Sequence, residues 1–197
     1  MANETTLFQD LQVKAFRAGV APRTKSAQKW FQLQVQKMKN INRWELMKNK
    51  ELTNVKKPKV GEMFMYFYEP KYADVLPYYD TFPLIIMVDK APGGFYGLNL
   101  HYLPNRERAK FFDALMGTMN NKLYDETTRM KVNYQLLKQV SKLKYFKACF
   151  KHYLTSHVES QIVRVDPTEW EIALFLPVQR FKKASVSQIY SDSKGKY

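Results

Sequence analysis

A chain of 197 residues with 45% hydrophobic residues is long enough for one domain with a core and too apolar to be disordered. Its single cysteine, Cys149, excludes an internal disulfide, and no apolar run reaches the roughly 20 residues that a membrane span needs. The formal net charge of +14 favours a polyanionic partner, because an excess of like charges opposes folding. Nucleic acid is the expected polyanion, with an anionic membrane surface or an acidic protein as alternatives.

Residues 1–60 are expected to form a basic N-terminal helical extension. The spacing of apolar residues predicts a helix over 24–39, with Thr24 as its N-cap. Lysines occupy the opposite side of this helix: Lys25, Lys29 and Lys39. A shorter helix is expected over 5–18. Residues 40–60 lack a clear period and are expected to form a connecting loop that carries Lys57 and Lys59.

Residues 61–180 are expected to form a barrel-like core. Aromatic and β-branched residues predict strands over 62–68, 82–88 and 94–103, and the Pro and Gly residues before the third strand predict a hairpin. Two more strands are expected over 160–165 and 170–177. The fold class is therefore α+β: a small antiparallel sheet or SH3-like barrel, interrupted by a helical insertion and preceded by the helical extension.

The helical insertion is expected at about 104–155. Apolar spacing predicts helices over 104–120 and 126–143, with Lys131, Lys138 and Lys142 on the outer side of the second. A third, short helical stretch is expected within 146–156. The last residues, 181–197, are polar and are expected to be an exposed tail.

The basic residues are unevenly distributed along the chain. Residues 1–60 carry 13 basic and 4 acidic side chains, and residues 104–155 carry 11 and 4, whereas the aromatic-rich segment between them is nearly neutral. Lys and Arg bind phosphates without reading base sequence, so the collective excess, more than any single lysine, predicts nucleic-acid binding. The candidate nucleic-acid-binding residues are Lys25, Lys29, Lys39, Lys57, Lys59, Lys131, Lys138, Lys142, Lys147, Lys151, Arg180, Lys182 and Lys183.

Signals of catalysis are weak. The chain contains no phosphate-binding glycine loop and no nucleophile elbow, and His101, His152 and His157 lack the spacing of metal ligands on a helix. Asp80 and Glu69 leave a metal-dependent nuclease open as an alternative. We expect no enzyme activity, no catalytic residue, no metal and no cofactor. Tyr78 and Tyr79 are the place where exposed aromatic rings for base stacking are expected.

Two long stretches and a short one resemble a known family. "MFMYFYEPKYADVLPYYDTFPLIIMVDKAPGGFYGLNLHYLPNRERAKFFDAL", "KACFKHYLTSHVESQIVRVDPTEWEIALFLPVQRFKKAS" and "AQKWFQ" are similar to the DNA end protector proteins of tailed bacteriophages of the T-even type. The matching motif residues are Tyr78, Tyr79, Asp80, Phe82, Pro83, Gly94, Gly97, Asn99, His101, Tyr102, Leu103 and Pro104. The resemblance assigns them no binding role. We interpret 76–83 as a buried loop and 97–104 as a strand that leads into a helix.

The resemblance implies a virion protein that completes the head and binds the ends of the packaged double-stranded genome. It implies protection of those ends from host exonuclease by occlusion, without sequence specificity. The implied partners are DNA ends and phage portal or neck proteins, with no membrane and no small-molecule substrate. The implied locations are the virion and the host cytoplasm. The alternative within the virion is a structural head or neck protein without affinity for free DNA.

Overall fold

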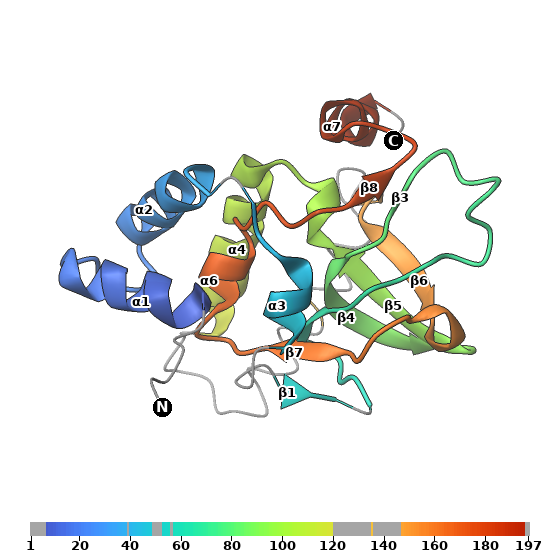
Figure 1. Cartoon of the computed structure of the whole chain (residues 1–197), viewed down its shortest axis with the longest axis horizontal. Coiled ribbons are helices and arrows are strands. Elements are labelled where there is room, and N and C mark those ends of the chain that lie inside the picture. The colour runs from blue at the N-terminus through green and yellow to red at the C-terminus, as the bar shows by residue number, and fades with distance from the viewer. Residues whose placement is uncertain are drawn as a thin grey trace.

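An antiparallel sheet with helices against one of its faces organises the chain (Figure 1). The computed structural model describes residues 7–38, 40–48, 53–55, 57–119, 135 and 147–195. Its main sheet is six-stranded, with the order β1-β7-β2-β4-β5-β6 and antiparallel pairing throughout. The strands are β1 (Thr53–Asn54), β2 (Met63–Met65), β4 (Leu84–Ala91), β5 (Gly94–Asn99), β6 (Phe150–Leu154) and β7 (Val163–Val165).

The sheet is open at both edges. Among the described residues, no pairing joins the edge strands β1 and β6. The α+β class and the small antiparallel sheet are therefore confirmed, whereas the SH3-like barrel is not. The strands expected over 62–68, 82–88 and 94–103 correspond to β2, β4 and β5, and β4 and β5 form the expected hairpin. Two further strands, β3 (Tyr79–Asp80) and β8 (Phe181–Lys182), pair as a separate short ribbon.

Both faces of the sheet are apolar, because successive side chains along a strand point to opposite sides. Met63, Leu84 and Ile86 belong to the large core that the helices cover. Phe64 and Ile85 face the other way, into a smaller and mainly aromatic core. Burial on both faces explains why β2 and β4 read as continuous apolar runs instead of alternating patterns.

The N-terminal helices α1 (Leu7–Arg17) and α2 (Lys25–Gln36) confirm the two helices expected there. Thr24 caps α2 as predicted, and its hydroxyl oxygen accepts a hydrogen bond from the Ala27 N–H at 3.1 Å. The loop expected over 40–60 is wrong in part, because residues Arg43–Lys48 form helix α3. The Asn42 side chain accepts a hydrogen bond from the Trp44 N–H at 3.1 Å, and Leu46 and Met47 are buried.

The helical insertion begins as expected with α4 (Asn105–Met119), which the 3-10 helix η1 (Leu100–Tyr102) joins to β5. The helix expected over 126–143 lies outside the described residues except for Gln135. The short helix expected within 146–156 is wrong: β6 occupies 150–154, and a 3-10 turn, η3 (Thr155–His157), follows it. Tyr153 is the one buried residue of that strand, which pairs with β5 along its length, so sheet pairing decides the conformation of this mixed basic and aromatic segment.

The C-terminal part differs most from expectation. The strand expected over 160–165 is confirmed as β7, but the one expected over 170–177 is wrong, because Trp170–Ala173 form helix α6. Every residue from 169 to 176 is buried, so this run carries no periodicity to separate helix from strand. The expected exposed tail is wrong for 186–195, which form α7 (Val186–Gly195), with Ile189 fully buried. None of the described helices is both long and apolar enough to cross a membrane.

Gly94, the first residue of β5, lies where the chain leaves no room for a side chain. A Cβ atom there would lie 1.8 Å from the backbone oxygen of Tyr153 on the neighbouring strand. Gly117 in α4 is the opposite case, since a Cβ atom would meet nothing within 4 Å. The two glycines form a matched pair for testing the β5–β6 contact.

We predict that Gly94→Ala lowers the free energy of unfolding by about 1–3 kcal/mol, because the β5 and β6 backbones must separate. Gly117→Ala should raise it by about 0.5–1 kcal/mol, because alanine is the better helix former. Urea unfolding followed by circular dichroism measures both. Equal stability of wild type and Gly94→Ala would show that β6 does not lie against β5 in this register.

Candidate nucleic-acid interface

A buried carboxylate holds together the part of the fold where several cations reach the surface. One oxygen of Asp80 accepts hydrogen bonds from the backbone N–H groups of Phe82 and Arg180, each at 3.0 Å. The other accepts from the side-chain amide of Asn99 at 3.2 Å and from Nδ1 of His101 at 2.7 Å. Asp80 therefore ties β3, β5 and η1 to the segment that leads into β8.

The charges in this buried network are balanced. Burial raises the pKa of Asp80, but its interaction with His101 and the backbone donors outweighs burial, so the pKa lies below its ordinary value. Burial lowers the pKa of His101, which is therefore neutral at pH 7 and donates Nδ1–H to Asp80. Arg108 and Arg43 both interact electrostatically with Asp80 and supply positive charge near it.

Arg108 in α4 extends the network toward the C-terminus. Its guanidinium donates to the carbonyl oxygens of Leu103 at 2.7 Å, Leu174 at 2.9 Å and His101 at 3.2 Å, and to the hydroxyl of Tyr190 at 3.0 Å. Arg108 is 1% exposed, so this residue contributes to the sequence charge but offers no surface contact. The network instead positions other cations.

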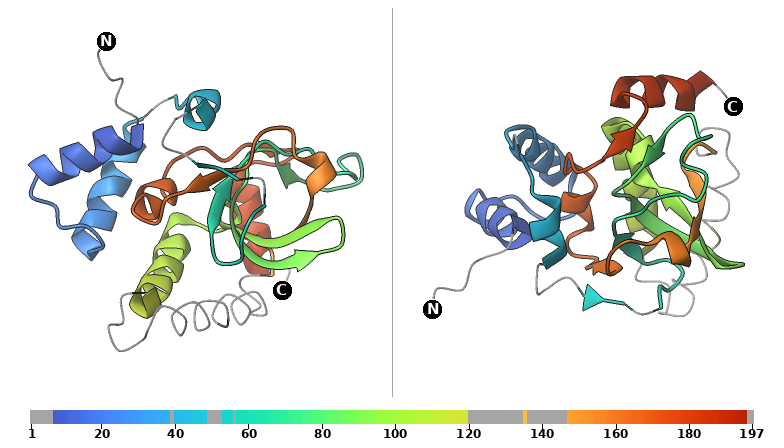
Figure 2. Two further views of the ribbon diagram at one scale, coloured as in Figure 1. Left: turned by 90° about the horizontal axis from the view of Figure 1, so that it is seen from below. Right: turned by 45° about the vertical axis from the view of Figure 1, so that its right-hand side comes forward.

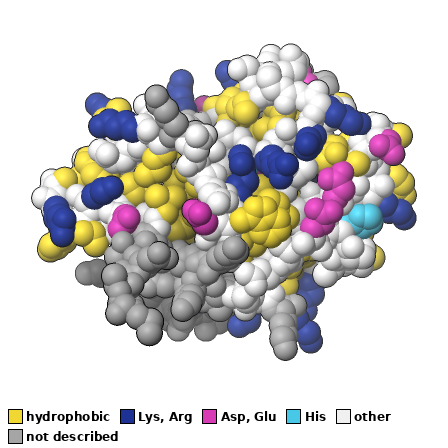
Figure 3. Space-filling view, viewed as in Figure 1, with side chains coloured by type: hydrophobic (Ala, Val, Ile, Leu, Met, Phe, Trp, Pro, Cys, Tyr) yellow, Lys and Arg dark blue, Asp and Glu magenta, His cyan; other side chains and the backbone are white. Residues whose placement is uncertain are grey.

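The exposed candidate cations lie in three separate places. Lys25 and Lys29 lie on α2, Lys57 and Lys59 in the loop between β1 and β2, and the third group, Arg180 and Lys182, lies at β8. Figure 2 shows α1 and α2 together at one end of the molecule, away from β8. On the face drawn in Figure 3, the Lys and Arg side chains form distinct groups. None of the six forms an ion pair with a described carboxylate.

Two further candidates have other partners. The Lys183 ammonium donates to the carbonyl oxygens of Ala73 at 2.6 Å, Asp74 at 2.8 Å and Leu76 at 3.2 Å, so its three N–H donors are used. The Lys151 ammonium lies 4.4 Å from the centre of the Tyr102 ring, and burial lowers its pKa. We therefore interpret Lys183 and Lys151 as structural residues.

The structure says little about the remaining five candidate nucleic-acid-binding lysines. Lys147 is exposed just before β6 and has a contact of its own within the protein. Four others lie outside the described residues: Lys39, Lys131, Lys138 and Lys142.

Sequence reasoning missed Arg43 and Trp44, which lie beside the β8 cations. The Arg43 side chain donates to the carbonyl oxygens of Val178 at 2.7 Å and Gln179 at 3.1 Å, directly before Arg180. Trp44 is 55% exposed, and its indole stacks on the Phe67 ring with 4.2 Å between ring centres. The signal in the sequence was Asn42, a good N-cap ahead of a short apolar pattern.

Tyr78 and Tyr79, the place considered for base stacking, both have contacts within the protein. The Tyr79 hydroxyl donates to Glu69 at 2.9 Å, and the Tyr78 ring packs 6.2 Å from that of Tyr102. Both tyrosines are half-buried. The two rings are therefore partly covered by their contacts within the protein, and their role in base stacking stays a prediction.

The groups considered for catalysis have structural partners. The two oxygens of Asp80 accept four hydrogen bonds, and Glu69 accepts one from Tyr79. Within the described ranges, no group of three or more His, Cys, Asp and Glu side chains is placed to hold a metal ion. The Cys149 thiol is buried, and burial raises its pKa to about 12.

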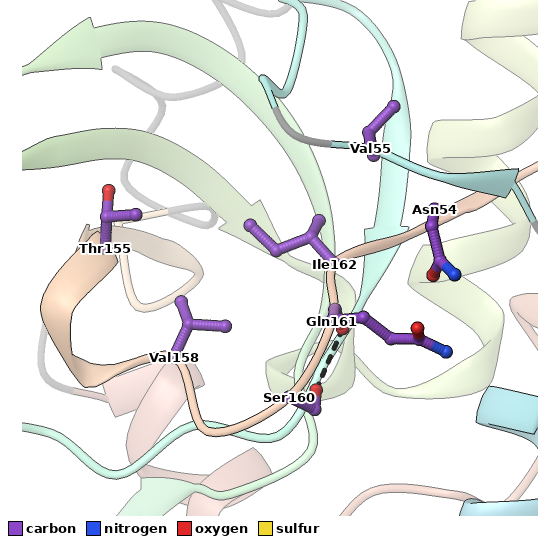
Figure 4. A pocket seen from close by; sticks show the side chains of 7 residues that line it. All are labelled: Asn54, Val55, Thr155, Val158, Ser160, Gln161 and Ile162. Carbon is purple, nitrogen blue, oxygen red and sulfur yellow. Dashed lines mark hydrogen bonds between the residues drawn. The ribbon is translucent and has the colours of Figure 1, made fainter.

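A hollow of about 410 Å³ lies between the β1–β7 edge and the turn after β6 (Figure 4). Its lining has no charged side chain: Asn54, Val55, Thr155, Val158, Ser160, Gln161 and Ile162. The Ser160 hydroxyl and the Gln161 amide form hydrogen bonds within the protein. Such a lining does not match a phosphate, so this hollow is not part of the candidate interface.

The open α+β sheet and the exposed cations at its margins define a basic protein suited to contact with a polyanion. The family model described as phage T4 terminal DNA protecting protein matches residues 4–194, nearly the whole chain. The chain therefore belongs to this bacteriophage family, which confirms the resemblance. No curated protein and no solved structure matches the chain.

The buried network predicts a loss of stability in mild acid. The pKa of His101 is lowered in the folded protein, while an unfolded histidine has a pKa of about 6.5. As the pH falls below that value, the unfolded chain binds the proton first, so the free energy of unfolding decreases, by up to about 1.4 kcal/mol per pH unit. Asp80 causes a second decrease in the free energy of unfolding when the pH falls below the ordinary pKa of an aspartate, because its pKa is also lowered in the folded protein.

We predict that His101→Asn, in which the amide can still donate to Asp80, shows a smaller stability difference between pH 7.5 and 5.5 than the wild type. His152→Asn is the control, because His152 is exposed. Urea unfolding at the two pH values measures the effect. The same pH dependence in wild type and His101→Asn would contradict a neutral His101 in the fold.

Proposed function

We propose that the protein binds the ends of packaged linear double-stranded DNA without reading base sequence, shields them from host exonuclease, and completes the phage head. The observation that carries the proposal is the family match over residues 4–194. The exposed cations of α2, the β1–β2 loop and β8 support it, because they offer positive charge to phosphate. We propose the virion, and the host cytoplasm after injection, as the places of action.

The mechanism that we propose is occlusion. An exonuclease needs a free duplex end, and a protein seated on that end denies access without any bond being cut. Contacts to phosphate fix the position of the protein and carry no base information, which suits a task that must succeed on any terminal sequence. No catalytic residue, metal or cofactor is required for this role.

A contact with portal or neck proteins is a second part of the proposal. Phe16 on α1 is 84% exposed and Val75 in the loop before β3 is 78% exposed. Single exposed apolar side chains are ordinary on protein surfaces, so these two residues mark a docking site only if they belong to a contiguous apolar patch. A head or neck protein without affinity for free DNA would use these residues and leave the cations unused.

The proposal is tested by exonuclease digestion of linear duplex DNA with and without the purified protein, at two salt concentrations. We expect protection at low salt that weakens at higher salt, and stronger competition from linear duplex than from closed circles. Digestion at the unprotected rate at both concentrations would contradict the proposal. Equal competition by circles would leave DNA binding but remove its end specificity.

We predict that Arg180→Ala with Lys182→Ala weakens DNA binding and reduces the slope of log affinity against log salt by about 1 for each lost phosphate contact. The fold should survive, because Arg180 contacts Asp80 and Thr81 through its backbone alone. Lys90→Ala, at an exposed lysine of the β4–β5 hairpin, is the matched control. Filter binding over a salt series measures the slopes, and unchanged slopes would remove β8 from the interface.

A further inference from the structure

An aromatic stack runs from the core to the surface at α3. The Phe67 ring packs on Phe82 with 4.8 Å between centres, and the Trp44 indole lies on Phe67, at 4.2 Å and an interplanar angle of 26°. Phe67 and Phe82 are buried, whereas Trp44 is 55% exposed. One face of the indole is therefore supported by the core, and the residue still offers a large apolar surface to solvent.

Two arginines lie beside this stack. Arg43 precedes Trp44 in α3 and is held by the carbonyl oxygens of Val178 and Gln179, which places it next to Arg180. Burial and the proximity of Arg180 lower the pKa of Arg43, and the nearby Asp80 carboxylate opposes this shift without reversing it. Neither arginine forms an ion pair with a described carboxylate. Figure 3 shows Lys and Arg atoms beside exposed hydrophobic atoms near the middle of this face.

The Arg43 and Arg180 guanidinium groups repel each other, and the buried Asp80 carboxylate offsets this repulsion only in part. An anion bound beside the two arginines at the surface would relieve the rest. A phosphate suits this position because Arg binds phosphate oxygens in a bidentate manner. The neighbouring indole suits a base, because base–aromatic stacking tolerates any sequence. The combination of stacking surface and phosphate-binding cations points to nucleic acid and not to an acidic peptide.

A duplex end offers one surface that internal duplex lacks, which is the face of the terminal base pair. We propose that Trp44 stacks on this terminal base pair while Arg43 and Arg180 contact the terminal phosphates. The inference rests on the proposed function and deepens it, because it names the contact that distinguishes an end from the rest of the duplex. It also explains how an end is recognised without base-edge hydrogen bonds.

The other exposed aromatic residues within the described ranges lack this arrangement. Phe16 is 84% exposed on α1 and has no ring contact with another described aromatic residue. Tyr72 is 62% exposed, and the Lys71 ammonium lies 5.3 Å from the centre of its ring. Phe16 is therefore a matched control: an exposed aromatic residue in a basic helix, but without a ring beneath it.

The test compares three DNAs of equal length and sequence: a blunt linear duplex, the same duplex with both ends closed by hairpin loops, and a closed circle. Trp44→Leu keeps an apolar cover over Phe67 but removes the aromatic face, and Trp44→Phe restores it. We expect Trp44→Leu to reduce the preference for the blunt duplex by about tenfold or more. Affinity for the circle should stay within about twofold of wild type, and Trp44→Phe and Phe16→Leu should keep most of the preference.

Each other outcome has a defined meaning. If Trp44→Leu keeps the preference for the blunt duplex, the stacking role is wrong while the proposed function stands. Equal losses on all three DNAs would also overturn it, because a merely structural role of Trp44 produces that result. If the wild type does not distinguish open ends from closed ones, the end specificity of the proposed function fails together with the stacking role.

Discussion

The Asp80 carboxylate is the constraint on which the rest of the structure depends. It is buried, it stays ionised, and its two oxygens accept four hydrogen bonds from different parts of the chain. A buried charge of this kind persists only where hydrogen bonds and a compensating charge surround it, and Arg108 and Arg43 supply positive charge near it. Because one of the four donors is the Arg180 backbone, an interior residue of a nearly neutral segment fixes where the cations of β8 reach the surface.

The charge of a protein and the charge that it offers to a partner are different quantities here. Arg108 is enclosed, Lys183 is held by three carbonyl oxygens, and Lys151 lies on an aromatic ring. On the face that Figure 3 shows, the Lys and Arg side chains form separate groups, not one continuous patch. Long-range attraction to DNA depends on the total charge, whereas specific binding to a duplex end depends on the few charged groups that the fold holds in place.

Sequence patterns were sufficient where one face of an element is buried or a turn residue marks its end. They located α1, α2, α4 and the β4–β5 hairpin. They were insufficient for α6, which is buried on all sides, and for α3, which is too short to show a period. The spacing of Arg108, Phe111, Phe112 and Leu115 already places the arginine on the buried face of α4, so its role was readable. The proximity of Arg43 to Arg180 could not be predicted from the sequence, because it depends on a hydrogen bond from Arg43 to Val178, 135 residues away.

Cys149 gives this fold a built-in chemical probe. It is the chain's single thiol, it lies directly before β6, and its carbonyl oxygen accepts a hydrogen bond from the Asn99 N–H at 2.8 Å. A buried thiol with a raised pKa reacts with alkylating reagents only when the surrounding structure opens and the thiolate forms. The alkylation rate therefore reports how often the edge of the sheet beside the Asp80 network separates from β5, without a label having to be introduced.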